Sequence, residues 1–465
     1  MKKFKLYTYT WAILALISLQ ACNLSETNID PTRQTGSELS LILPSALTHT
    51  AFNQSANPAR VAGIVMQQFE GFDAQQVDYT NYVIGDVTFN NYWRTGLYAG
   101  VLKDCDVLIK QAQEEGQPYY EGIAKILMAS EYATAASFFG DIPLTEALQG
   151  NDNLQPAYDS QAFIYETAQT MLDEAISLLG MDPVPGGPGS DDLIYGGDAA
   201  SWIAVAHALK ARYYMHLSKR DGEAATKALA ELSKTFGSLA EQPDFAWENN
   251  TLSNSPLAKF GQERPNTLLI NSAFKMAMDA NADPRASFYS TEDFKYWGTA
   301  DLFWAQNNSV IPLISYVEVA FLKAEAMLAT GSPIADVEAQ LEMGIEASMD
   351  QMGMAPEDYA DYVSTAMSME GLSEEEALEH IMEEAYYAYF GFAFQQIWTN
   401  YRRTGYPDLT PNPVGVNGLN PSGVIPTRFL YPVSEAQTNS ANLNAAISAQ
   451  GWSAGLLDDG TWAFK

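Results

Sequence analysis

The chain has 465 residues, and its 57 acidic residues against 25 lysines and arginines give a formal net charge of −32 at pH 7. A chain this acidic is not expected to bind nucleic acid or an anionic membrane surface through its charge. Hydrophobic residues make up 47% of the chain and aromatic residues 12%, which excludes a disordered protein and permits a large core.

The N-terminal segment has the residue order of an export signal. Three lysines form a basic start, residues 11–19 carry no charge and are mostly apolar, and the small Ala21 precedes Cys22. The apolar stretch is too short to span a bilayer, so residues 1–21 are predicted to be a signal peptide that is removed. A cysteine at the cleavage point resembles the lipobox of bacterial lipoproteins, which predicts that Cys22 is diacylated and anchors the chain to a membrane. An ordinary signal peptide with a coincidental cysteine is the alternative.

A polar stretch at residues 22–38 is predicted to be a tether between this anchor and the folded chain. Later segments carry apolar residues at the i, i+3, i+4 and i+7 spacing of a helix that buries one face. Ser373, followed by three glutamates, predicts an N-cap with an acidic first turn. Cys105 is predicted to be a small core side chain. The helical segments are residues 102–116, 119–140, 160–180, 199–222, 314–331, 335–353 and 373–401.

Three of these helices share a short motif at residues 127–129, 209–211 and 322–324. Each copy has a leucine, an alanine two residues later, a large side chain three residues after the alanine, and a glycine further on. Small residues let helices approach closely, and glycine often ends a helix. The pattern suits tetratricopeptide-like helix pairs, although the copies are too far apart for a regular array. The chain is therefore predicted to be mainly all-α.

Long stretches without helical periodicity separate the helices at residues 181–198, 237–310 and 405–465. The first is rich in proline and glycine, and the other two are rich in proline, asparagine and aromatic residues. Loops of this length are unusual unless they are functional, and a helical scaffold that carries large loops is a common arrangement for a binding surface. Few strands are expected, and residues 423–433 are the candidate for a short one.

The sequence lacks the common catalytic motifs. With two cysteines, four histidines and no H-E-x-x-H pattern, a transition-metal site is not expected, and no cofactor-binding or nucleophile motif is present. Because there are 57 carboxylates, a pair suitable for glycoside hydrolysis is no signal in itself. Asp191, Asp192 and Asp198 lie in a glycine-rich loop, but their spacing lacks the alternation of a dedicated calcium loop.

Several stretches together resemble the SusD/RagB family of Bacteroidetes surface lipoproteins. They occur in the order of the family and span nearly the whole chain after Cys22. An Asn-x-Asp-Pro segment at residues 28–31 fits as well. The stretches are FFGDIPLTEAL (138–148), GGDAASWIAVAHALKARYYMHLS (196–218), DPR (283–285), PLISYVEVAFLKAEAML (312–328), YRRTGYPDLTP (401–411) and IPTRFLYPVSEAQTNSANLNAAI (425–447).

The resemblance implies a single domain over residues 39–465, in which tetratricopeptide-like helix pairs carry a loop-rich half. It implies a protein without catalytic activity, cofactor or metal, which captures oligosaccharides for a SusC-like TonB-dependent transporter. The location implied is the outer membrane, with a lipid anchor and the domain facing the exterior. Some members of the family bind peptides, so an oligopeptide ligand is an alternative. Two other classes stay open, a lipoprotein glycoside hydrolase and a helical-repeat scaffold for other proteins.

Some residues within these stretches are better explained by structure than by ligand binding. Arg402 and Arg403 are expected to pair with buried carboxylates or with carbonyl groups at helix ends. Trp202, Trp398 and Tyr214 stand at helical spacing and are expected in the core.

Residues for ligand contact are predicted from sugar chemistry, because sugars stack their C–H faces on exposed aromatic rings and hydrogen-bond to amides and carboxylates. Residues 69–86 and 288–308 combine these side chains. The alternative is that the aromatic rings hold the loops onto the scaffold. The predicted contacts are Phe72, Gln76, Asp78, Tyr79, Asn81 and Tyr82 in the first loop, and Tyr296, Trp297, Trp304 and Asn308 in the second.

The charge of the chain indicates which ligands it favours. Residues 69–86 contain no lysine or arginine, and residues 288–308 contain only Lys295. A polyanion therefore meets repulsion without a basic patch to offset it. A neutral glycan is the predicted ligand, with a peptide as the runner-up, and its binding is expected to depend weakly on salt.

Overall fold

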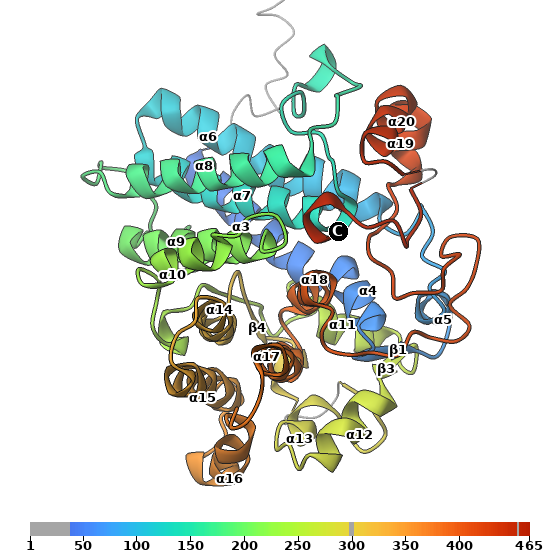
Figure 1. Cartoon of the computed structure of the whole chain (residues 1–465). Helices are drawn as coiled ribbons and strands as arrows, with labels where there is room; N and C mark the ends of the chain where they lie inside the picture. Colours follow the sequence, from blue (N-terminus) through green and yellow to red (C-terminus); the bar gives the residue numbers. More distant parts are fainter. Residues whose placement is uncertain (1–37, 297–301, 453–454) are drawn as a thin grey trace, which may run out of the picture.

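The computed structural model describes residues 38–296, 302–452 and 455–465 of the chain. It is mainly helical, and one layer of long helices fills the upper left of Figure 1. This layer consists of α3 (Leu39–Ser55), α6 (Leu102–Glu115), α7 (Pro118–Phe139), α8 (Gln161–Leu179), α9 (Ala199–His216) and α10 (Ala224–Leu232). Cys105 of α6 is fully buried, as predicted.

Helix α7 is the centre of this layer, because it packs against α3, α6, α8 and α9. Buried residues of α7 occur around its whole circumference, as expected for a helix with no side facing solvent. A side chain at Gly122 would come within 2.8 Å of Leu179, so the close approach of α7 to α8 requires glycine there. Gly140, with φ of +87°, ends α7.

A second group of helices follows, with α14 (Tyr316–Ala329), α15 (Ile334–Asp350), α16 (Pro356–Ala366), α17 (Glu374–Ala388) and α18 (Phe394–Thr404). Helix α14 packs on α10 and α9, and α17 packs on α14 and α15. The hydroxyl of Ser373 accepts from the Glu376 amide while the Glu376 carboxylate accepts from the Ser373 amide. This capping box confirms the N-cap predicted from the sequence.

Buried arginines link helices of the two groups and also link two helices within the second group. Arg212 of α9 donates from Nε and Nη2 to the Glu318 carboxylate of α14 at 2.6 and 2.7 Å. Arg403 of α18 forms a bidentate ion pair of the same kind with Glu325 of α14. Arg402 donates to the carbonyl of Ser137 near the end of α7. The two arginines of α18 therefore have the structural roles predicted for them.

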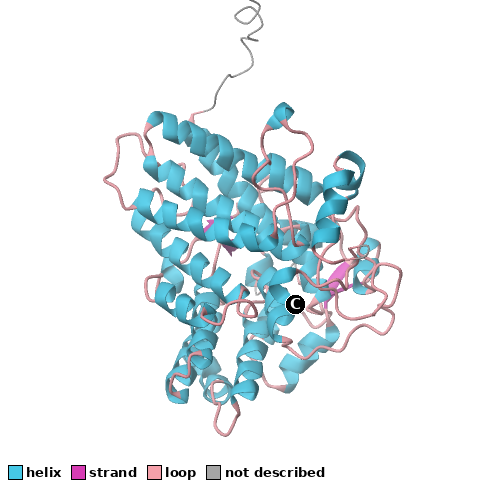
Figure 2. Cartoon of the chain, turned by 45° about the horizontal axis from the view of Figure 1, so that its top comes forward, coloured by secondary structure: helices cyan, strands magenta, loops and turns pink. Residues whose placement is uncertain are grey.

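Most of the short elements occupy the other side of the molecule, where Figure 2 shows the densest loops, whereas one strand pair lies among the long helices. Two antiparallel pairs make up the strands, β1 (Phe69–Gly71) with β3 (Leu268–Ile270) and β2 (Asp244–Ala246) with β4 (Val310–Pro312). Phe69 lies opposite Ile270 in the first pair, and Phe245 opposite Ile311 in the second. The short helices are α4 (Asn57–Val65), α5 (Gln75–Thr80), α11 (Pro256–Glu263), α12 (Ser272–Ala280), α13 (Ala286–Tyr289), α19 (Val433–Thr438) and α20 (Ser440–Ala449).

Irregular helical turns complete the elements. The segment η1 (Tyr92–Val101) is a π-helical stretch before α6, and the rest are single 3₁₀ turns. These turns are η2 (Gly150–Asp152), η3 (Leu239–Glu241), η4 (Phe303–Ala305) and η5 (Trp462–Phe464). Among the described residues no helix has both the length and the apolar character needed to cross a membrane.

The structure corrects two details of the loop prediction. Residues 237–310 include α11, α12 and α13, which are too short for their periodicity to stand out in sequence. Residues 423–433 form no strand, because they run across the end of α7 and make only isolated backbone hydrogen bonds to it. One example runs from the Phe429 amide to the Phe138 carbonyl.

The core assignments of the aromatic residues agree with the structure. Trp202 and Trp398 are fully buried, and Tyr214 is half-buried against the core. The aspartates of the loop at 181–198 serve the backbone around them. Asp192 accepts from the amide of Gly197 and from the indole of Trp202, and Asp198 caps α9.

Candidate ligand-binding surface

Strand pairing brings together the two segments predicted to contact ligand. β1 leads directly into α5, while β3 pairs with β1 and its Ile270 amide donates to the Phe294 carbonyl at 2.8 Å. The ring of Phe69 lies 5.3 Å from that of Tyr296 and 6.0 Å from that of Trp304, centroid to centroid. Residues 69–86 therefore lie beside the described part of residues 288–308, although more than 200 residues separate them in sequence.

Several of the predicted contact residues point into the core. Tyr296 and Trp304 stack on each other with centroids 5.4 Å apart, and both rings are buried. Tyr79 and Tyr82 are buried as well. In this conformation these four rings hold the loops onto the scaffold, as the alternative interpretation had it, and they offer a ligand no face. Trp297 lies outside the described residues.

The side chains left at the surface define a smaller patch. Phe72 is 57% exposed, Asp78 is exposed and Asn81 is half-exposed, all within one short stretch around α5. We call these three residues the α5 surface. Asn308 is also exposed, but the structure does not bring it to this patch. Its neighbour Asn307 bonds to Ser255 at the start of α11, whereas the Phe72 amide bonds to Thr267 beyond the other end of that helix.

Gln76 has an unusual environment beneath the α5 surface. Its side chain is 1% exposed, yet neither its amide nitrogen nor its amide oxygen has a hydrogen-bond partner in the described structure. An unpartnered buried amide costs about 1–3 kcal/mol, so such a group needs an explanation. Helix α5 folds back so tightly on β1 that a side chain at Gly71 would lie 2.0 Å from the Gln76 carbonyl oxygen.

A third segment, which the sequence analysis did not single out for ligand contact, covers the far end of α5. Asn412 donates from its backbone to the Tyr82 hydroxyl at 3.0 Å and from Nδ2 to the Thr80 carbonyl at 2.7 Å. The loop leaves Val414 and Val416 62% and 64% exposed. These valines add apolar surface to the segment whose Asn412 and Asn417 side chains bond to Asn81. The only signal in sequence was the Asn- and Pro-rich composition of residues 410–424.

One half-buried cation, Arg60, lies under the two loops. The Arg60 guanidinium stands 4.1 Å from the centroid of the Phe260 ring. Burial lowers the pKa of Arg60 to about 10, partly offset by the nearby hydroxyls of Tyr296 and Tyr79. Arg60 remains charged at neutral pH, but it is placed below the aromatic rings, so the α5 surface itself presents carboxylate, amide and aromatic groups.

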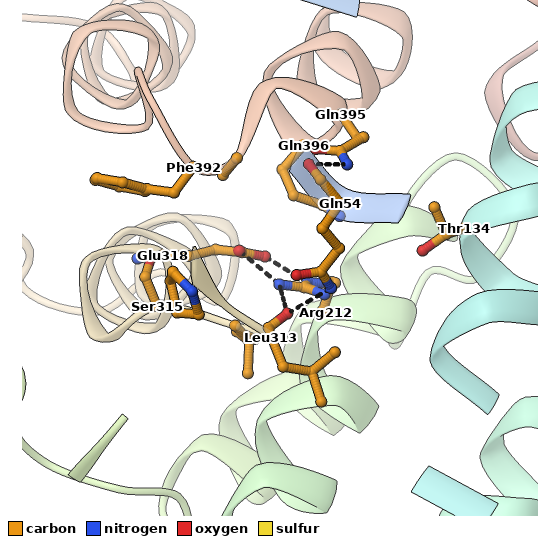
Figure 3. A pocket seen from close by; sticks show the side chains of 12 residues that line it. Gln54, Thr134, Arg212, Leu313, Ser315, Glu318, Phe392, Gln395 and Gln396 are labelled. Atoms are coloured by element: carbon orange, nitrogen blue, oxygen red, sulfur yellow. Dashed lines mark hydrogen bonds and ion pairs between the residues drawn. The ribbon is translucent and has the colours of Figure 1, made fainter. Parts of the chain in front are cut away.

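A separate cavity lies inside the scaffold, where Arg212, Glu318, Gln54 and Gln396 converge (Figure 3). Its volume is about 20 Å³, which is enough for one water molecule. Polar groups that line this cavity already have partners: Arg212 is paired with Glu318, and Gln54 donates to the Leu313 carbonyl. This cavity is too small for a sugar and belongs to the packing between α3, α9 and α14.

Comparison with known proteins adds the family to this geometry. Residues 31–432 match the SusD-like family model, which is described as starch-binding associating with outer membrane. The chain belongs to the SusD-like family. The match supports a nutrient-binding function and an association with the outer membrane, and the mainly helical fold agrees with it. No curated protein matches the sequence.

Solved structures of SusD-like proteins share the fold. A SusD/RagB family protein from Bacteroides thetaiotaomicron is 22% identical with a TM-score of 0.71, and the match covers 92% of this chain and 99% of that one. A chitin-binding SusD homologue from Flavobacterium johnsoniae is 21% identical with a TM-score of 0.74, covering 91% and 99%. A chitin-binding protein is 22% identical with a TM-score of 0.76, covering 92% and 100%.

Proposed function

We propose that this protein captures neutral oligosaccharides at the α5 surface and delivers them to a SusC-like TonB-dependent transporter, without catalysis. The observation that carries the proposal is the exposed Phe72 ring with Asp78 and Asn81 beside it. An aromatic face and hydrogen-bonding groups on one patch match the two sides of a sugar ring. The family description and the titles of the chitin-binding structural neighbours support a carbohydrate ligand.

Gln76 is proposed to take part when ligand is bound. Its unpartnered amide carries both donors and acceptors, which is the chemistry that sugar hydroxyls need. A small outward movement of α5 would bring this amide to the ligand. Tyr79 and Tyr82 stay in the core in this proposal, and Asn308 is proposed to contact only an oligosaccharide long enough to extend along α11.

The anchor is proposed to be a diacylated Cys22, which holds the domain at the outer membrane and facing the exterior. In the Cys22→Ala variant, metabolic labelling with an alkyne fatty acid should give no labelled protein. Label retained on that variant would show that the lipid is elsewhere. In detergent, the intact lipoprotein should co-purify with a large TonB-dependent barrel, and soluble partner proteins in place of the barrel would favour a scaffold.

Calorimetry tests the binding site itself. A soluble form that begins after Cys22 should bind a neutral oligosaccharide such as tetra-N-acetylglucosamine, and Phe72→Ala should weaken binding about tenfold through the lost ring contact. Phe163→Ala is the matched control, because Phe163 is 41% exposed on α8, away from the site. Equal affinity of wild type and Phe72→Ala would contradict the site. Shortened sugar products in the same mixture would favour a glycoside hydrolase.

A further inference from the structure

A large cleft of the described structure lies away from the α5 surface. It has a volume of about 650 Å³ and opens between the α12–α13 turn and one face each of α16 and α17, at the lower edge of Figure 1. Ligand sites commonly have volumes of about 300–1,000 Å³, so the cleft is large enough for one or two sugar rings. The match to the SusD-like family does not by itself assign a role to this cleft.

The spacing of residues along α16 and α17 builds this cleft. In each helix, four polar residues recur at i, i+3, i+4 and i+7, which places them on one face. The α12–α13 turn closes the third side with Asn281, Ala282 and Pro284. The facing residues are Asp358, Asp361, Tyr362 and Thr365 on α16, and His380, Glu383, Glu384 and Tyr387 on α17.

A buried ion-pair network fixes the floor of the cleft. Arg285, which is fully buried, donates from Nη2 to Glu384 at 2.9 Å, to the Tyr362 hydroxyl at 2.9 Å and to Asp283 at 2.7 Å. Tyr362 donates in turn to the other oxygen of Glu384 at 2.9 Å. Burial alone would lower the pKa of Arg285, but Asp283 and Glu384 raise it well above its ordinary value. Arg285 is therefore shared between two carboxylates, Asp283 and Glu384, and it holds the Tyr362 ring in place.

The rest of the cleft carries uncompensated negative charge. Asp358, Asp361 and Glu383 are exposed, and none of them forms an ion pair among the described residues. No lysine or arginine is among the described residues that line the cleft, and His380 is bonded through Nε2 to the Ala366 carbonyl. Burial, and then the neighbouring Glu379, raises the pKa of Glu383. A bound cation would relieve this repulsion.

We propose that the cleft is a second ligand site, which binds a sugar unit with a protonated amino group. This inference rests on the proposed function, since it makes an amino sugar one of the nutrients captured. The ammonium group binds to Asp361 and Glu383, the C–H face of the ring contacts Tyr362 and Tyr387, and hydroxyls bond to Asn281 and Thr365. Burial, and then Glu383, raises the pKa of Tyr387 to about 12, so its hydroxyl stays protonated and able to donate.

Two probes with the same sugar backbone, one with charged amines and one with neutral acetamido groups, test this assignment. Tetraglucosamine and tetra-N-acetylglucosamine have the same backbone, and at about pH 6 the amines are protonated while most carboxylates are ionised. The soluble form should bind tetraglucosamine with an affinity that falls as salt rises. The double variant Asp361→Asn/Glu383→Gln should weaken that binding about tenfold and leave tetra-N-acetylglucosamine unaffected.

The matched control is Glu357→Gln/Glu374→Gln, which removes one exposed charge from each of the same helices outside the cleft. It should change the affinity for tetraglucosamine by less than about twofold. An equal loss in both double variants would overturn the site in favour of general attraction to an acidic protein. A lysine-rich peptide that binds here when tetraglucosamine does not would overturn the ligand class. Binding of tetraglucosamine without any binding of the neutral tetramer would contradict the α5 surface but support the cleft.

Discussion

The α5 surface and the cleft between α16 and α17 use similar side chains on different foundations. The α5 surface stands on a three-residue strand and a six-residue helix, and it presents one exposed ring above an unpartnered buried amide. The cleft stands on helices of 11 and 15 residues, and its buried acidic group is fully paired. Short elements hold a site that a ligand can adjust, whereas long helices hold charges at fixed separations.

The difference also sets the ligand chemistry at each place. Residues 69–86 around α5 carry four acidic residues and no basic one, so a neutral sugar is expected to bind there through stacking and hydrogen bonds rather than through charge. In the cleft, three exposed carboxylates without counter-ions determine the affinity. We therefore expect binding at the α5 surface to respond weakly to salt and binding in the cleft to respond strongly.

The largest expected effect comes from removing Arg285 at the floor of the cleft. Arg285→Ala leaves Asp283 and Glu384 buried without their partner and should lower the free energy of unfolding by about 3–5 kcal/mol. Urea unfolding measures this loss. In the folded variant the site becomes more acidic, but the Tyr362 ring loses the bond from Arg285 that fixes it. Tetraglucosamine binding should therefore fall, while binding of the neutral tetramer stays. Arg285→Lys keeps the charge but loses the planar set of donors. Its stability and its affinity for tetraglucosamine should therefore lie between those of wild type and Arg285→Ala. Equal loss of both ligands would show that the two regions are not independent.

A pH effect in the scaffold should leave both sites unchanged. Burial raises the pKa of Glu131 in α7 to about 8, although a hydrogen bond from Asn53 lowers it in part. Between the ordinary value of 4.5 and about 8, the folded chain keeps a proton that the unfolded chain releases. The free energy of unfolding should therefore fall as pH rises through this window, by up to about 1.4 kcal/mol per pH unit.

Glu131→Gln should remove that decline, because glutamine is neutral at every pH. Unfolding curves at several pH values compare it with wild type and with Glu114→Gln, an exposed site on the neighbouring helix α6. If Glu131→Gln and wild type lose stability in parallel, another group is responsible. Neither ligand should bind differently to the variant.

The smallest effect is expected at Gln76, where stability and binding should change in opposite directions. Gln76→Met removes the unpartnered amide while keeping the size of the side chain, so the free energy of unfolding should rise by about 1 kcal/mol. Binding of the neutral tetramer should weaken, because the amide is proposed to meet its hydroxyls. A variant that is more stable and binds as well as wild type would show that the Gln76 amide takes no part in binding.

The sequence predicts the scaffold well because helical periodicity is local. The long helices and the N-cap at Ser373 follow from short-range patterns, and the structural role of Arg403 follows from its charge. Whether an aromatic ring in a loop faces inward is not local. Tyr296 and Trp304 are buried because Phe69, from a distant strand, packs against them.

The cleft shows a different limit of prediction. The polar face of α17 is visible in sequence at His380, Glu383, Glu384 and Tyr387, but a charged helix face usually meets only solvent. What makes it a cleft is the α12–α13 turn, almost 100 residues away in the chain, with Arg285 beneath it. No local pattern indicates that contact.

Hydrogen exchange with and without ligand tests the two-site account most directly, because it reports where each ligand slows amide exchange. Tetra-N-acetylglucosamine should protect the amides of β1 and α5 and leave α16 and α17 unchanged. Tetraglucosamine should in addition protect α16, α17 and the α12–α13 turn, and should no longer do so in Asp361→Asn/Glu383→Gln. Protection of α16 and α17 by the neutral tetramer, or protection by neither ligand at α5, would contradict the account.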